Sequence, residues 1–270
     1  MRGIFSAGVL DGLLRLGLDE FDLAIGTSAG ACNLASFLSR QHERNLRCYT
    51  NIMARKQLFS LHRALSGGHY MDLDWLWDTF ASEEPLDQDA IAARRTELIA
   101  VATCAHTANP IYLSIKAPNI HDHLKASCAL PLLYRGPVRI DQHSLVDGGL
   151  VDPIPAREAH RRGARRILVI RSRPSATVKR DGRLDGAIAA LLRAQPAVAN
   201  ASRLTARRYR EAVAFLQSPP PDTQLLELAP DRPLATGRTT QDLKALRTDY
   251  QLGLQVAERY ADRIAQLLAC

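Results

Sequence analysis

A serine is set among very small residues in the stretch FDLAIGTSAGACN, which runs from Phe21 to Asn33. Ser28 stands between Gly26 and Gly30 in the pattern G-x-S-x-G. A serine nucleophile has to project from a tight strand-to-helix turn where bulky neighbours would clash, and this pattern is typical of such a turn. Short patterns of this kind also arise by chance in ordinary turns, so the interpretation depends on the rest of the chain.

A serine nucleophile needs a general base, and the chain offers one acidic candidate in a special setting. Asp147 follows the strand-like HSLV and precedes Gly148 and Gly149, so the turn is tight and other backbone can approach it. An Asp-Gly pair also forms ordinary turns between strands. His160, the one histidine after Asp147, lies beside two arginines in an expected surface helix, and we expect it to be solvated rather than catalytic.

Taken together, GTSAG (26–30) and DGG (147–149) resemble the motifs of the patatin-like phospholipases, a family of acyl hydrolases. The distance of 119 positions from Ser28 to Asp147 suits that family. The resemblance covers 1–174, and the rest is similar to a bacterial subgroup with a C-terminal extension. It implies a Ser28–Asp147 dyad without histidine, an acyl-enzyme on Ser28, a phospholipid or other fatty acyl ester as substrate, and neither cofactor nor metal.

The family also has an oxyanion loop, G-G-G-x-R-G, after its first strand. This sequence begins MRG, so Arg2 and Gly3 match the end of the loop, and the resemblance assigns Arg2, Gly3 and Ala29 to oxyanion or substrate binding. Arg2 would meet a substrate phosphate or, alternatively, pair with a carboxylate of the protein. Since the first strand and the three glycines are absent from the sequence as given, we expect an upstream translation start or a shortened chain. The missing piece should be a Val/Leu/Ile-rich strand followed by Gly-Gly-Gly.

Three functions therefore stay open at this point. The favoured one is a serine lipid acyl hydrolase of phospholipase A type. The second is a thioesterase or small-ester esterase that uses the same dyad. The third is a non-catalytic lipid-binding protein, because each lost oxyanion donor typically lowers the rate by ~10²–10³.

The composition indicates an anionic partner. The 35 Lys and Arg exceed the 28 Asp and Glu, giving a net charge of +7, with basic residues gathered at 157–174 and 203–211. Such a balance favours phospholipid surfaces, although arginine-rich usage can also reflect a GC-rich genome. Nucleic acid is not expected, because no zinc-finger, RNP-type or basic-zipper pattern accompanies the charge. No sequence feature indicates an oligomeric state.

The chain also lacks the signals of export. It has no signal peptide and no run of ~20 apolar residues, so we expect a cytoplasmic protein that contacts the inner membrane surface peripherally. Five scattered cysteines without a C-x-x-C pair indicate free thiols.

Helical and strand patterns alternate along the first 174 residues. Helices are expected at 4–17, 29–40, 42–59, from about 72, at 119–131 and at 153–163. Strands are expected at 21–26, 97–105, 110–116 and 165–172, with a hairpin at 137–149. This order predicts an α/β protein with a three-layer α/β/α patatin-like fold and a mainly parallel central sheet. We divide the chain into an acyl hydrolase domain, 1–174, and a mostly helical extension, 175–270, that packs on it and includes a strand at 223–230 and a closing helix at 239–269.

Overall fold

A computed structural model describes residues 1–116, 118–177 and 188–269. Part of the helical stretch expected after Pro174, at 178–187, and one of the five cysteines, Cys270, lie outside the described residues.

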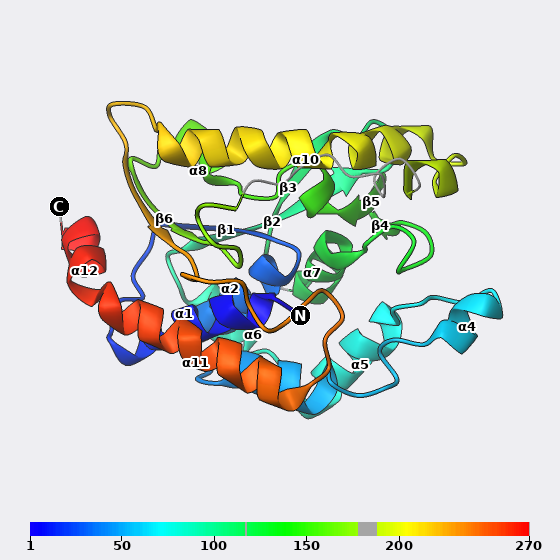
Figure 1. Ribbon diagram of the computed structural model, residues 1–270, viewed down its shortest axis with the longest axis horizontal. Coiled ribbons are helices and arrows are strands. Elements are labelled where there is room, and N and C mark those ends of the chain that lie inside the picture. The colour runs from blue at the N-terminus through cyan, green and yellow to red at the C-terminus, as the bar shows by residue number, and fades with distance from the viewer. Residues whose placement is uncertain (117, 178–187, 270) are drawn as a thin grey trace.

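The helices and strands follow the expected alternation (Figure 1). Before the first long strand come α1 (Gly3–Arg15), β1 (Leu23–Thr27), α2 (Ala29–Leu38), α3 (Arg44–Arg47), the π-helical segment η1 (Cys48–Ile52), α4 (Leu61–Leu65), α5 (Leu73–Glu83) and α6 (Gln88–Ala92). The middle of the chain forms β2 (Glu97–Cys104), β3 (Pro110–Ser114), α7 (Ile120–Cys128), β4 (Val138–Ile140), β5 (His143–Asp147), the 3₁₀ turn η2 (Gly148–Leu150), α8 (Ala156–Arg161) and β6 (Arg166–Ile170). The last part forms α10 (Pro196–Gln217), β7 (Gln224–Leu228), α11 (Leu243–Arg259) and α12 (Ala261–Ala269).

The strands form two sheets. The larger runs β1-β2-β5-β4, with β3 on the other edge of β2, and the smaller pairs β6 with β7. The predicted α/β class is confirmed, but the expectation of a mainly parallel sheet is corrected. Of the strand pairs in the described residues, β1–β2 and β6–β7 are parallel, while β2–β3, β2–β5 and β4–β5 are antiparallel. The short connections within β2–β3 and β4–β5 allow only antiparallel pairing, because a parallel pair needs a long crossover.

Helices cover both faces of the strands, as a three-layer fold requires. Figure 1 shows α8 and α10 on one side and α1, α2 and α11 on the other. The alternation of β6 matches this arrangement, because Ile167 and Val169 pack with Tyr209 and Val213 of α10. The intervening Leu168 and Ile170 pack against the main core on the opposite face.

The predicted start of α5 is confirmed, since the side chain of Asp72 accepts a hydrogen bond from the backbone N–H of Trp75. The expected closing helix is instead two helices, α11 and α12, which are separated at Tyr260. The strand expected at 223–230 is β7. The region after residue 174 therefore contains a strand as well as helices.

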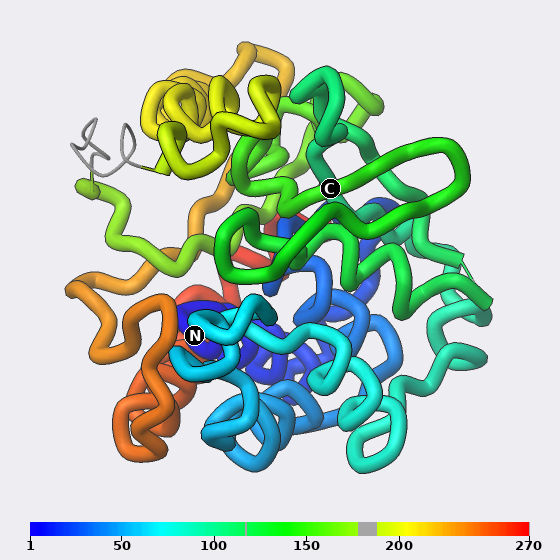
Figure 2. The backbone as a smooth tube through the Cα atoms, turned by 90° about the vertical axis from the view of Figure 1, so that its right-hand side faces the viewer, coloured from blue at the N-terminus to red at the C-terminus, as the bar shows by residue number. Residues whose placement is uncertain are grey.

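The first helix is clamped against the C-terminal region by very close packing. A Cβ added to Gly8 would lie 2.1 Å from the Tyr250 carbonyl oxygen, and one added to Gly253 would lie 2.2 Å from the Phe5 carbonyl oxygen. The Tyr250 hydroxyl also donates to the buried Asp11 carboxylate at 2.8 Å. In Figure 2 the blue start of the chain lies beside the orange segment that leads into α11. Glycines therefore let the backbones of α1 and α11 touch.

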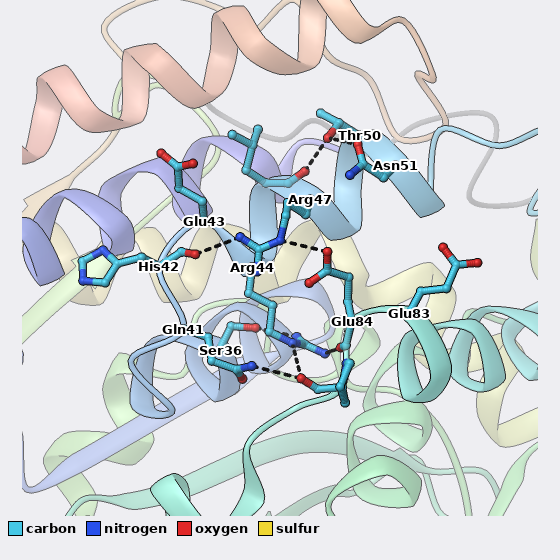
Figure 3. A network of polar contacts seen from close by, with 12 residues as sticks. Ser36, Gln41, His42, Glu43, Arg44, Arg47, Thr50, Asn51, Glu83 and Glu84 are labelled. Atoms are coloured by element: carbon cyan, nitrogen blue, oxygen red, sulfur yellow. Dashed lines mark hydrogen bonds and ion pairs between the residues drawn. The ribbon is translucent and has the colours of Figure 1, made fainter.

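A buried arginine fixes the segment that follows α2. The Arg44 guanidinium donates from Nη1 to the Ser36 hydroxyl at 2.7 Å and from Nε to the Pro85 carbonyl at 3.3 Å (Figure 3). Arg47 adds an ion pair with Glu84 at 2.8 Å. These contacts join α2 and α3 to the end of α5, whose apolar face lines the cavity described below. None of the helices in the described ranges is long and apolar enough to cross a membrane.

Candidate active site

Two strands bring the predicted nucleophile and base together. β1 and β5 pair with the same edge of β2, one parallel and the other antiparallel, so their C-terminal ends meet head to head. Thr27 lies opposite Val101, and Asp147 lies opposite the next residue, Ala102. Ser28, which follows Thr27, therefore emerges beside Asp147 although the two are far apart in the sequence.

Ser28 stands at the turn between β1 and α2 in an unusual backbone conformation. Its φ is 55° and its ψ is −128°, a region that costs a non-glycine residue about 1–3 kcal/mol. Gly26 makes the turn possible, because a Cβ there would lie 2.4 Å from the backbone nitrogen of Ala31. The predicted strand–turn–helix setting of G-x-S-x-G is therefore present.

The Ser28 backbone is held by Ser127, a residue that the sequence reasoning did not single out. The Ser28 N–H donates to the Ser127 hydroxyl at 2.8 Å, and that hydroxyl donates to the Val101 carbonyl at 2.6 Å. Ser127 is fully buried and lies in KASCALP, the stretch before the hairpin. Its only signal in the sequence was that stretch, which looks similar to the family's pattern at the same place.

Asp147 is buried at the end of β5, with only 3% of its surface exposed. Its Oδ1 accepts the Gly149 N–H at 2.8 Å, whereas its Oδ2 is buried and has no hydrogen-bond partner among the described residues. Burial raises the pKa of Asp147 to about 6, against the opposing effects of the Ser28 hydroxyl, the Gly149 N–H and the charge of Arg238. The carboxylate is therefore ionised at neutral pH and more basic than an ordinary aspartate.

The motif glycines differ in how much space surrounds each of them. A Cβ at Gly148 would lie 2.2 Å from the Val101 carbonyl oxygen, and one at Gly149 would lie 2.9 Å from Asp147 Oδ1. Gly148 therefore lets the turn after Asp147 lie directly against β2. Gly149 lets the backbone come close enough for its N–H to donate to the Asp147 carboxylate. A Cβ at Gly30 would meet nothing within 4 Å, so the second glycine of G-x-S-x-G borders open space instead of protein.

Ser28 and Asp147 open into a cavity of about 560 Å³, a size typical of small-molecule sites. The cavity lies between the two sheets, since every residue of β1 and of β6 borders it. Its walls are mostly apolar and include Leu23, Ile25, Phe37, Leu73, Leu76, Trp77, Phe80, Leu124, Leu130, Leu168 and Ile170. A hydrocarbon chain would find an apolar surface next to the serine.

Arg2, Gly3 and Ala29, the other predicted site residues, border the same cavity. Gly3 and Ala29 are the first residues of α1 and α2, where backbone N–H groups have no acceptor within the helix. The two helix starts touch, because a Cβ on Gly3 would lie 3.1 Å from the Ala29 Cβ. Arg2 forms no ion pair with any carboxylate that the structure describes.

His160 lies apart from this arrangement. Its ring faces Asp222 at 3.4 Å and stacks edge-on against Phe215, and the residue does not border the cavity. The free thiols of Cys32 and Cys128, by contrast, border the cavity with their sulfur atoms 3.5 Å apart. No sequence pattern indicated this pair, because the two cysteines are far apart in the chain.

Two family models match separate parts of this chain. A family model described as patatin-like phospholipase matches residues 1–160. A second model, described as a domain of unknown function (DUF6363), matches residues 195–269. A protein of Escherichia coli (strain K12) with the printed name "Uncharacterized protein YjjU" is 34% identical over 276 residues, which span 99% of this chain and 76% of that relative.

Proposed function

Because this chain belongs to the patatin-like phospholipase family, we propose that it is a serine lipid acyl hydrolase of phospholipase A type. Family membership supports a lipid acyl hydrolase in general. The proposal adds that Ser28 and Asp147 form the catalytic dyad and that the substrate is a fatty acyl ester of a phospholipid.

The observation that carries the proposal is the pairing of a strained serine with a buried carboxylate in one apolar cavity. Ser28 adopts a costly backbone conformation, and Asp147 keeps a buried Oδ2 without a partner. Neither feature stabilises the fold, and such features gather at active sites. The apolar cavity beside them suits an acyl chain.

The proposed reaction begins with transfer of the Ser28 hydroxyl proton to the Asp147 carboxylate while the serine oxygen attacks the ester carbonyl carbon. The tetrahedral intermediate collapses to an acyl-serine, and the leaving alcohol takes the proton from Asp147. Water then attacks the acyl-serine and gives its proton to Asp147, and release of the fatty acid returns that proton to Ser28. A pKa of about 6 for Asp147 makes it a better base than an aspartate of ordinary pKa near 3.9.

Backbone N–H groups at the starts of α1 and α2 are the proposed oxyanion donors. The Ser28 N–H is already bound to Ser127, so we assign this role to the N–H groups of Gly3 and Ala29. Helix starts favour negative charge through both their free N–H groups and their dipoles. Each such donor contributes ~10²–10³ in rate in related chemistry.

The first experiment labels the protein with a fluorophosphonate and locates the adduct by mass spectrometry. We expect modification of Ser28 in the wild type and none in Ser28→Ala. Asp147→Asn should also lose labelling and ester hydrolysis, whereas His160→Ala should keep both within about twofold. An unlabelled, inactive but folded wild type would instead support the non-catalytic lipid-binding protein.

The substrate is tested by comparing phospholipid, acyl-CoA and short-ester hydrolysis with the same preparation. Preference for phospholipid, measured as kcat/KM, supports the lipid acyl hydrolase. Preference for acyl-CoA or for short esters would support a thioesterase or a small-ester esterase on the same dyad.

A further inference from the structure

Three arginines from distant parts of the chain gather at the cavity that holds Ser28 and Asp147. Arg2 lies at the start of α1, Arg173 follows β6, and Arg238 lies in the segment before α11. All three border the cavity. Arg238 is near enough to Asp147 for its charge to lower the pKa of that carboxyl, so the group extends to the dyad itself.

None of the three guanidinium groups is held in an ion pair by the residues that the structure describes. Within 1–116, 118–177 and 188–269, none of them makes an ion pair or a side-chain hydrogen bond, and only Arg173 has a ring contact, with Tyr209 at 5.6 Å. Other arginines that border the cavity differ in this respect. Arg171 pairs with Glu227 at 2.7 Å, and Arg44 is held by the hydrogen bonds of Figure 3.

This arrangement is electrostatically unfavourable without an added anion. Burial, followed by the charges of Arg173 and Arg238, lowers the pKa of Arg2 to about 10. Like charges that are partly removed from water repel each other more strongly than they do in solvent. A bound anion would relieve both the burial and the repulsion.

We propose that Arg2, Arg173 and Arg238 form a phosphate-binding subsite beside the dyad, and that the substrate is an acyl ester whose alcohol portion carries a phosphate group. Guanidinium groups present planar forks of N–H donors that match phosphate oxygens. The subsite places the phosphate next to Asp147 and leaves the apolar part of the cavity to the acyl chain. The phosphorylated ester in this inference rests on the proposed function, whereas the assignment of Arg173 and Arg238 to its phosphate goes beyond it.

The first arm of the test compares two esters with the same acyl chain, a 1-acylglycerol 3-phosphate and the corresponding 1-acylglycerol. We expect the wild type to prefer the phosphorylated ester by at least about tenfold in kcat/KM, since a charge-assisted hydrogen bond contributes about that factor. Arg173→Gln should raise KM for the phosphorylated ester about tenfold and leave the neutral ester unchanged. Arg173→Lys should restore part of the loss, because a charge remains.

A matched control separates this effect from a general loss of positive charge. Arg95 is exposed, lies outside the cavity and has no ion pair among the described residues. Arg95→Gln removes the same charge and should change neither ester. A decrease in Arg95→Gln equal to that in Arg173→Gln would overturn the subsite.

The second arm measures binding without catalysis in the Ser28→Ala protein. Glycerol 3-phosphate should bind in calorimetry at low ionic strength and raise Tm, glycerol should do neither, and Arg173→Gln in the same background should abolish both effects. If no ester is cleaved at all, the proposed function fails while this arm still decides the subsite. Absence of binding together with equal kcat/KM for the two esters would refute it. Inorganic phosphate that binds as tightly as glycerol 3-phosphate, without preference for the phosphorylated ester, would show a free-phosphate site and would also refute it.

Discussion

Replacing Asp147 with asparagine should abolish hydrolysis and, at the same time, make the protein more stable at neutral pH. The carboxylate is buried with Oδ2 unpaired, and its pKa is raised from an ordinary value near 3.8 to about 6. A difference of about two pKa units corresponds to ~3 kcal/mol. Asparagine keeps an oxygen for the Gly149 N–H and carries no charge, so it avoids most of that cost.

The stability difference between Asp147→Asn and the wild type should depend on pH. Between about pH 4 and pH 6 the folded wild type binds a proton at Asp147 more tightly than the unfolded chain does. Its free energy of unfolding should therefore decrease as the pH rises through this window, whereas Asp147→Asn lacks this decrease. We expect the variant to be more stable by about 1–3 kcal/mol at pH 7.5 and the difference to vanish near pH 4.

Urea unfolding followed by tryptophan fluorescence at several pH values measures this difference. Asp78→Asn is the matched control, because Asp78 is exposed on α5 and its replacement removes one charge without relieving burial. The control should show no such pH-dependent gain. An Asp147→Asn protein that is no more stable than the wild type at pH 7.5, or a difference that does not change with pH, would refute the reasoning.

Four further results are expected. The logarithm of kcat/KM should fall with a slope of one below about pH 6, because only the ionised Asp147 accepts a proton, and a profile that stays flat to pH 5 would contradict this. Ser127→Ala should destabilise the protein by about 1–3 kcal/mol in urea unfolding, since it removes the hydrogen-bond partner of the Ser28 N–H and of the Val101 carbonyl, and activity should fall with it. Gly148→Ala should lower the free energy of unfolding by about 1–3 kcal/mol, because the added Cβ clashes with β2. Gly30→Ala should unfold at the same urea concentration as the wild type. Equal effects of the two substitutions would show that the cavity is not open at Gly30. Binding to anionic vesicles should exceed binding to neutral ones in co-sedimentation and weaken with salt, while salt-insensitive binding to both would leave the +7 charge without a membrane role.

Local sequence patterns predicted most of the elements, because short-range physics decides them. The helical pattern at 4–17 predicted α1, the small residues around Ser28 predicted the β1–α2 turn, and the helix expected from about residue 72 is α5. The pairing of strands was harder to predict. It depends on contacts between residues far apart in the chain, and the antiparallel β2–β5 pair that sets Asp147 beside Ser28 has no local signal.

In the site, too, residues in local motifs could be predicted, whereas contacts between distant residues could not. Ser28 and Asp147 stand in motifs, so they could be predicted, whereas their roles stay predictions until the variants are measured. Ser127 acts through one hydroxyl that accepts from the Ser28 backbone, and Arg238 approaches the dyad from the segment before α11. Neither contact is encoded in a pattern that a sequence displays. The proposed division of the chain at 174 likewise remains a prediction, although β6 and β7 pair across it.

The close packing of α1 against α11 has a consequence for how the protein is made. The hydroxyl of Tyr250 meets Asp11 across 239 positions of the chain. At a synthesis rate of about 5–20 residues per second, α1 exists for roughly 12–50 seconds before its partner helix has been translated. During that interval α1 can already pack against α2 and α3, but the face that α11 covers in the finished protein has no partner. We therefore expect the face of α1 that packs against α11 to stay exposed until synthesis is nearly complete.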